Sequence, residues 1–231
     1  MTQITATYID HMGSDLSVVN AARVSFGKES EWVRQDLCGD EITHYDGESG
    51  KTLSQRDTKL INYLASHKHL SPFGHAFASF HVKAPIFVAR QLVKHKFLRW
   101  NEISRRYVDD VPEFYTPDVW RGRAEDVKQG SGAESKSQYF PSIYAEEVNA
   151  KAVEDYRKML QQGVAPEQAR MILPQSTMTE WYWSGSLDAF ADMCRLRCAT
   201  DTQAETQKVA WDISLKMEDL FPVSWNALRD E

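Results

Sequence analysis

A short basic segment, Lys94 to Tyr107, holds the residue types of this chain that are best suited to chemistry. It reads KHKFLRWNEISRRY, and six of its fourteen residues are Lys, Arg or His, in a protein with a formal net charge of −6. Asn101, Glu102, Ser104 and Tyr107 add donors and acceptors that can orient a ligand as well as attract it. The segment therefore predicts a docking site for an anionic ligand, with a solvated loop as the alternative.

Two predicted elements lead into this segment. Apolar and polar residues alternate from Ala76 to Lys83, which is the period-two pattern of a strand with one buried face. Pro85 then stands where a first helical turn tolerates it, and apolar residues at helical spacing follow as far as Val93. The basic segment thus follows a helix C-terminus, where backbone carbonyl groups favour nearby cations.

Length and composition restrict the class of protein. With 231 residues, of which 42% are hydrophobic, the chain can bury a large core, and we expect one domain over residues 1–231. The negative charge argues against general binding to nucleic acid or an anionic membrane. Cys38, Cys194 and Cys198 lack the paired spacing of a zinc site and are expected to be reduced thiols. Without a leader-like start or a bilayer-length apolar run, we expect a soluble, cytoplasmic protein.

Helical periodicity dominates the remaining sequence. Helices are expected at 57–67, along Val148 to Leu160, along Leu187 to Cys194, and along Val209 to Leu220. Gly163 should end the second helix and Pro222 the last one, and Thr202 with Glu205 should form a capping box for the last helix.

Residues 121–138 are rich in Gly, Ser, Lys and Glu, which favours a flexible loop. The predicted strands are few and do not alternate regularly with the helices, as a doubly wound sheet would require. The pattern therefore predicts the α+β class.

Several well-known site patterns are absent or incomplete. Neither G-x-G-x-x-G nor G-x-x-x-x-G-K-[ST] occurs, which argues against Rossmann and P-loop nucleotide binding. His69, His75 and His81 are a possible metal cluster, but no further Cys or carboxylate completes a coordination sphere, so no metal is expected. No G-x-S-x-G motif or activated cysteine supports a covalent nucleophile.

Two arginines lie in or beside apolar helical stretches, where each needs an anionic partner. Glu167 stands three residues before Arg170, and Asp201 stands four residues after Arg197, so local ion pairs are one interpretation. Binding of an anionic ligand is the other, and the sequence leaves both open.

Several sequence blocks together resemble one protein family. Lys94-His95-Lys96 is followed by seven residues and Ser104, and residues 101–107 read NEISRRY. This resembles the signature of the flavin-dependent thymidylate synthases, R-H-R, seven residues and Ser, with N-E-x-S-x-R-Y. Further blocks that resemble this family are AARVSF, HLSPFGHAFASFHVKAPIFVARQ, PEFYTP, ARMILP and LRCATDTQAETQ.

The resemblance implies an activity and an assembly. In such enzymes FAD accepts hydride from NADPH, and a one-carbon unit passes from methylenetetrahydrofolate to C5 of dUMP, giving dTMP without a cysteine nucleophile. It also implies a homotetramer with sites between subunits, and a central, mainly antiparallel sheet flanked by helices.

The resemblance also implies roles for individual residues. Catalytic roles fall to Arg197, Ser104 and His69, with Arg197 stabilising the pyrimidine as it polarises. The implied flavin contacts are Ser71, Lys94, His95, Lys96, Glu102, Ser186 and Asp192. The implied dUMP contacts are Gln91, Ser104, Arg105, Arg106, Arg170 and Arg197.

The chain departs from the family pattern at several positions. Lys94 and Lys96 replace two arginines, which retains charge but loses the bidentate fork. Ser186 and Asp188 stand where many members have Asn and Arg, so we expect FAD to be held partly by other groups. A non-catalytic nucleotide-binding or RNA-binding homologue and an NADPH-oxidising flavoprotein are the alternative functions.

Overall fold

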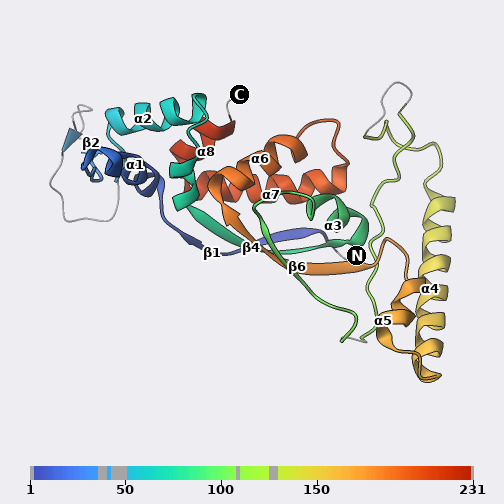
Figure 1. Ribbon diagram of the computed structural model, residues 1–231. Coiled ribbons are helices and arrows are strands. Elements are labelled where there is room, and N and C mark those ends of the chain that lie inside the picture. The colour runs from blue at the N-terminus through green and yellow to red at the C-terminus, as the bar shows by residue number, and fades with distance from the viewer. Residues whose placement is uncertain (1–2, 36–40, 43–50, 108–109, 125–129, 230–231) are drawn as a thin grey trace.

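A four-stranded antiparallel sheet lies at the centre of the computed structural model, in the order β1-β4-β6-β5 (Figure 1). The structure describes residues 3–35, 41–42, 51–107, 110–124 and 130–229. Its strands are β1 (Thr5–Met12), β4 (Phe77–Pro85), β5 (Arg99–Glu102) and β6 (Met178–Ser186). This confirms the predicted α+β class and the mainly antiparallel sheet.

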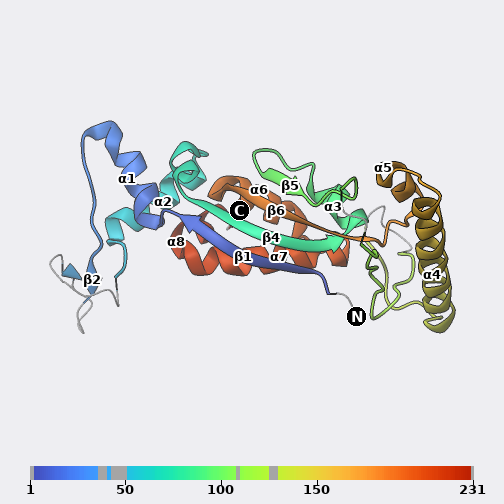
Figure 2. The same ribbon diagram turned by 90° about the horizontal axis from the view of Figure 1, so that it is seen from below.

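One face of the sheet is covered by helices. Ala78, Phe80, Val82 and Ala84 alternate along β4 and are buried, as the period-two pattern predicted. Helices α6 (Leu187–Arg197) and α7 (Ala204–Leu220) lie over this face, and α8 (Pro222–Arg229) packs against them and against α2. In Figure 2, which views the sheet from below, the strands lie in front of α7.

The remaining elements gather at the two ends of the sheet (Figures 1 and 2). At one end lie the helices α1 (Asp15–Arg23) and α2 (Gln55–Ser66) and the short helices η1 (Val24–Phe26) and η2 (Ser71–His75). The strand pair β2 (Arg34–Gln35) and β3 (Glu41–Ile42) lies at the same end. At the other end lie α3 (Ile86–Leu92), α4 (Tyr139–Gln161), α5 (Pro166–Ala169) and the short helix η3 (Arg170–Ile172).

Most helix predictions are confirmed, with earlier starts. Helix α2 begins two residues before Asp57, and α4 begins at Tyr139, well before the first predicted apolar position. Gly163 has φ +83° just after α4, and its N–H and that of Val164 bond back to Leu160 and Met159 carbonyls. These are the bonds of a Schellman ending, which explains why Gly163 closes the helix.

One boundary prediction is confirmed and another is wrong. Helix α7 ends at Leu220, just before Pro222, and Pro222 is the first residue of a further helix, α8, at a position where proline is tolerated. Thr202 and Glu205 do not form a capping box: Gln203 is the N-cap of α7, and the Thr202 hydroxyl donates to the Leu196 carbonyl at 3.0 Å. The sequence rule failed here because the chain turns before the helix begins.

Some predictions concern residues that the structure does not describe. Cys38 and residues 125–129 of the expected loop lie outside the described ranges. On the described flanks of that loop, the Gln138 side chain bonds to both the N–H and the carbonyl of Trp120, each at 2.8 Å. None of the helices within the described ranges is long and apolar enough to cross a lipid bilayer.

Candidate active site

Arg197 is held in place by groups that carry no negative charge. It is the last residue of α6, and its Nε donates to His95 Nε2 at 2.9 Å, while Nη2 donates to the Gln91 carbonyl at 3.3 Å. These two bonds use two of the five guanidinium N–H groups, which leaves three without a partner within the described ranges. Burial lowers the pKa of Arg197 from its ordinary value, but the group stays charged.

His95 is a neutral acceptor in this arrangement. Burial, and then the charge of Arg197, lower the pKa of His95 to about 4, although Asp192 acts in the opposite direction. Because Nε2 accepts from Arg197, the ring proton of the neutral imidazole lies on Nδ1. Since His95 follows the end of α3 and Arg197 ends α6, two helix C-termini meet at this point.

The Gln91 side chain joins the same group of residues from α3. Its amide nitrogen donates to Gln203 Oε1 at 2.6 Å, and its amide oxygen accepts from the Thr206 hydroxyl at 3.3 Å. We call Gln91, His95, Arg197, Gln203 and Thr206 the Arg197 cluster.

The other predicted dUMP contacts lie beyond β5, in a turn at residues 104–107. Ser104 Oγ accepts from the backbone N–H and from Nε of Arg106, at 3.3 and 3.1 Å. The Arg106 guanidinium lies 5.0 Å from the centre of the Tyr107 ring, and Arg105 donates to the Asp110 carbonyl at 2.9 Å. We call residues 104–107 the Ser104 turn.

A small cavity beside this turn brings several predicted residues together. It measures about 90 Å³, and Glu102, Arg105, Arg170 and Thr179 contribute to its lining. Glu102 is held there because its carboxylate accepts from Thr179 Oγ1 at 2.6 Å and from Trp100 Nε1 at 3.2 Å. Arg170 is exposed and donates to the Glu167 backbone carbonyl at 3.2 Å, so its charge is available to a ligand.

The Arg197 cluster and the Ser104 turn stay apart within one chain. Along the chain, strand β5 lies between His95 and Ser104, and its four residues span roughly 10 Å of extended backbone. No hydrogen bond or ion pair among the described residues joins the two groups. The sequence motif therefore contributes to two groups of side chains, each of which contains residues predicted to bind a ligand.

The segment between them presents free cations beside a strained backbone. Lys94 and Lys96 are exposed, and neither forms an ion pair with a residue that the structure describes. Phe97 has φ +66° and is 77% exposed, a left-handed conformation that is costly for a bulky residue. Such strain in an exposed aromatic residue is typical of functional loops.

His69 and Ser71 lie at the opposite end of the sheet, after α2. The Lys68 and His69 N–H groups bond to the carbonyls of Ala65 and Leu64, so α2 ends in a Schellman motif that fixes the His69 backbone. The His69 side chain is exposed and lies edge-on to the Tyr63 ring at 6.2 Å. Ser71 is the exposed first residue of η2.

The flavin contacts that the resemblance implied near α6, Ser186 and Asp192, lie at the start and in the middle of this helix, with Asp188 between them. Ser186 is its N-cap, and the Asp188 carboxylate has one buried oxygen, Oδ1, without a hydrogen-bond partner in the described chain. Asp192 is exposed and pairs with Arg195 at 3.0 Å. Across the described ranges, no three His, Cys, Asp or Glu side chains gather in a way that could hold a metal ion.

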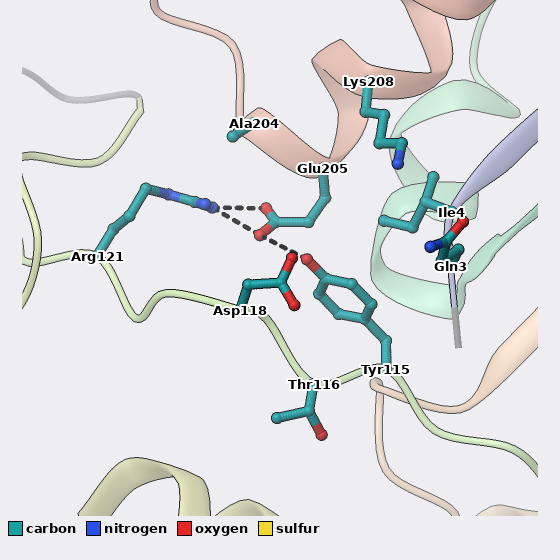
Figure 3. A pocket seen from close by; sticks show the side chains of 9 residues that line it. All are labelled: Gln3, Ile4, Tyr115, Thr116, Asp118, Arg121, Ala204, Glu205 and Lys208. Carbon is teal, nitrogen blue, oxygen red and sulfur yellow. Dashed lines mark hydrogen bonds and ion pairs between the residues drawn. The ribbon is translucent and has the colours of Figure 1, made fainter. Parts of the chain in front are cut away.

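The sequence analysis did not predict a second cluster of polar side chains, formed by Tyr115, Arg121 and Glu205. Glu205 is 5% exposed, and both of its oxygens accept from Arg121 Nη2 at 2.7 Å, while the Tyr115 hydroxyl donates to it at 3.4 Å (Figure 3). Burial, and then the charge of Glu205, raise the pKa of Tyr115 to about 12, so this hydroxyl stays protonated. These residues line a cavity of about 250 Å³ together with Asp118 and Lys208.

Comparison with known proteins places this geometry in a family context. The profile of the family described as thymidylate synthase complementing protein matches residues 7–223. A flavin-dependent thymidylate synthase of Thermus thermophilus is 36% identical over 222 residues, which are 96% of this chain and 74% of the relative. One from Kosmotoga olearia is also 36% identical, over 95% of this chain and 87% of the relative.

Solved structures give the same match at the level of the fold. A UMP/dUMP methylase, PolB from Streptomyces cacaoi, bound with 5-Br UMP, superimposes with a TM-score of 0.80 at 29% identity. The alignment covers 100% of this chain and 95% of that one. The same methylase bound with 5-Br dUMP gives a TM-score of 0.79 at 30% identity.

Proposed function

The chain belongs to the thymidylate synthase complementing protein family, with flavin-dependent thymidylate synthases among its relatives, and on this premise we propose that it methylates dUMP at C5. It is an enzyme of the methyltransferase class, and its cofactor is FAD. In the proposed reaction, dUMP, methylenetetrahydrofolate, NADPH and a proton give dTMP, tetrahydrofolate and NADP⁺. Folate as the one-carbon donor and NADPH as the reductant are the finer parts of this proposal.

The observation that carries the proposal is the environment of Arg197. The alternative interpretation of Arg197 was a local ion pair with Asp201, but the two residues form no ion pair in the described chain. Its two hydrogen-bond partners are neutral, so the guanidinium retains a full positive charge and free N–H groups. Such a fixed cation would stabilise negative charge that develops on a pyrimidine carbonyl.

The phosphate of dUMP would be held by the remaining arginines. Arg105 and Arg170 line the small cavity beside the Ser104 turn, and Arg106 follows Arg105 in that turn. Guanidinium groups match the geometry of phosphate oxygens. Ser104 would orient the nucleotide through its hydroxyl, because that oxygen is already directed by Arg106. His69 is proposed to act beside the flavin and the folate.

The residues present also fit a flavin nucleotide. Lys94 and Lys96 offer its phosphates two ammonium groups that form no ion pair with a described residue. Asp188 offers a hydroxyl or N–H group a buried oxygen that has no hydrogen-bond partner in the described ranges. Ser71, His95, Glu102, Ser186 and Asp192 are the further proposed flavin contacts. When bound, FAD supplies a hydride carrier and a relay for the one-carbon unit.

We also propose that the complete site forms between subunits of a homotetramer. Within one chain, no hydrogen bond or ion pair of the described residues joins the Arg197 cluster to the Ser104 turn, and His69 lies at the far end of the sheet. A second chain could bring its own copy of one group against the other. The size of the oligomer in solution, measured by light scattering, tests this part independently of activity.

The reaction is tested with purified protein. We expect a yellow protein that forms dTMP from dUMP when methylenetetrahydrofolate and NADPH are supplied. Colourless protein that FAD cannot saturate would contradict the proposal and favour a nucleotide-binding or RNA-binding homologue, whose affinity should fall steeply with salt. Peroxide formation without dTMP would instead identify an NADPH-oxidising flavoprotein.

UMP is a second candidate substrate. The observation that favours it is the similarity to a methylase of both UMP and dUMP. Parallel assays with the two nucleotides, compared as kcat/KM, decide between a deoxynucleotide-specific enzyme and one that accepts both.

A further inference from the structure

The side-chain amide of Gln91 is fixed at both ends by residues of one helix turn. Gln203 Oε1 accepts from its nitrogen at 2.6 Å, and the hydroxyl of Thr206 donates to its oxygen at 3.3 Å. Thr206 is fully buried, so its hydroxyl is not free to exchange this bond for water. The Gln91 amide nitrogen also lies 3.5 Å from the Phe87 carbonyl, which can only accept, so the nitrogen faces that side. With the amide held in this orientation, one lone pair of its oxygen remains for a ligand.

We propose that Gln203 and Thr206 are positioning residues for the nucleotide: they orient the Gln91 amide, and a buried ion pair fixes the helix turn that carries them. This inference rests on the proposed function, because it takes Gln91 as a contact of the bound nucleotide.

The ion pair belongs to the first turn of α7. Glu205 is the second residue of this helix, where a carboxylate also interacts favourably with the helix dipole. Its bonds to Arg121 and Tyr115 tie the turn to residues 115–121, as Figure 3 shows. That segment is itself anchored, because the Tyr115 N–H bonds to the Ser176 carbonyl at 2.8 Å.

The same turn reaches Arg197 through the backbone of Gln91. The Gln91 carbonyl accepts from Arg197 Nη2, so a shift of α3 at Gln91 changes the position of both groups. A contiguous path of hydrogen bonds therefore leads from Thr206 to the proposed catalytic arginine. Neither Gln203 nor Thr206 was among the candidate residues, since nothing in the sequence shows that they face Gln91.

The test compares Thr206→Val with wild type in a double-mutant cycle with Gln91→Ala. FAD-loaded protein is titrated with dUMP, and the change in flavin absorbance reports the Kd. Losing one hydrogen bond should raise the Kd about fivefold in the wild-type background and less than about twofold in the Gln91→Ala background. Gln203→Met, at a part-exposed position, is a second variant with the same expected pattern.

Ser214→Ala is the matched control. Ser214 lies on the same helix, and its hydroxyl accepts from Trp225 Nε1 at 3.2 Å, away from Gln91. It should lower the Tm without changing the Kd of dUMP. If Thr206→Val and Gln203→Met bind dUMP with the same Kd as wild type, this inference alone is overturned. It is also overturned if Thr206→Val raises the Kd equally in the wild-type and Gln91→Ala backgrounds. A yellow wild type that binds no dUMP would overturn the proposed function and this inference together.

Discussion

Replacing Arg197 by Ala should remove most turnover and leave a folded protein that binds FAD. The change deletes two hydrogen bonds, to His95 and to the Gln91 carbonyl. At about 1 kcal/mol each, their loss should lower the free energy of unfolding by about 1–2 kcal/mol. Loss of a fixed group that stabilises transition-state charge typically reduces kcat by about 10²–10³, or about 3–4 kcal/mol. The effect on turnover should therefore exceed the effect on stability.

The assay measures dTMP formation, FAD content and the Tm on the same preparation. Arg195→Ala is the matched control, since Arg195 is a neighbouring, exposed arginine of α6 that pairs with Asp192. NMR titration adds an independent reading: without the guanidinium, the pKa of His95 should rise from its value of about 4. Unchanged dTMP formation by the Arg197→Ala variant would refute its assigned role, and an unchanged His95 pKa would refute the proposed geometry.

Three other predictions test the surroundings of this site. His95→Gln should flatten the pH dependence of stability, measured by denaturant unfolding. The pKa of His95 is about 4 in the folded protein and about 6.5 in the unfolded chain. The free energy of unfolding of wild type should therefore fall by up to about 1.4 kcal/mol per pH unit as the pH is lowered from 6.5 to 4. Gly185→Ala should lower the Tm, because an added Cβ would lie 2.3 Å from Leu98 Cδ2 and 3.3 Å from the Phe97 carbonyl oxygen. Since the end of the Leu98 side chain can turn away, the cost should be about 1 kcal/mol. Gly74→Ala, with nothing within 4 Å, is the control, and equal Tm values would contradict the steric argument. Lys94→Arg should retain or improve FAD affinity in a fluorescence titration, because it restores a bidentate donor; a large loss would show that the flavin contact requires a lysine.

The sequence predicted the elements whose pattern is local. The alternation along β4 identified its buried face, and Gly163 marked the end of α4. These succeed because side-chain period and glycine chemistry act over a few residues.

Contacts between distant segments could not be predicted in this way. The bond between His95 and Arg197 joins residues 102 positions apart, and the one between Arg121 and Glu205 spans 84 positions. The local rule was misleading for Arg197: Asp201 lies at helical pairing distance only if α6 continues, but α6 ends at Arg197 itself. The family motif predicted a set of site residues, but it could not show that no hydrogen bond or ion pair in the described chain joins the Arg197 cluster to the Ser104 turn.

The choice of partners for Arg197 has a physical consequence. A carboxylate at the position of His95 would hold the guanidinium more tightly, but it would also cancel the charge that a polarised pyrimidine requires. A neutral imidazole and a backbone carbonyl orient the same group and leave its charge intact. The low pKa of His95 is part of this arrangement, because a protonated ring would lose its acceptor nitrogen and repel Arg197. The Arg197 cluster is therefore organised to position a cation without neutralising it, whereas Glu205, which faces no proposed ligand, neutralises Arg121 through both oxygens.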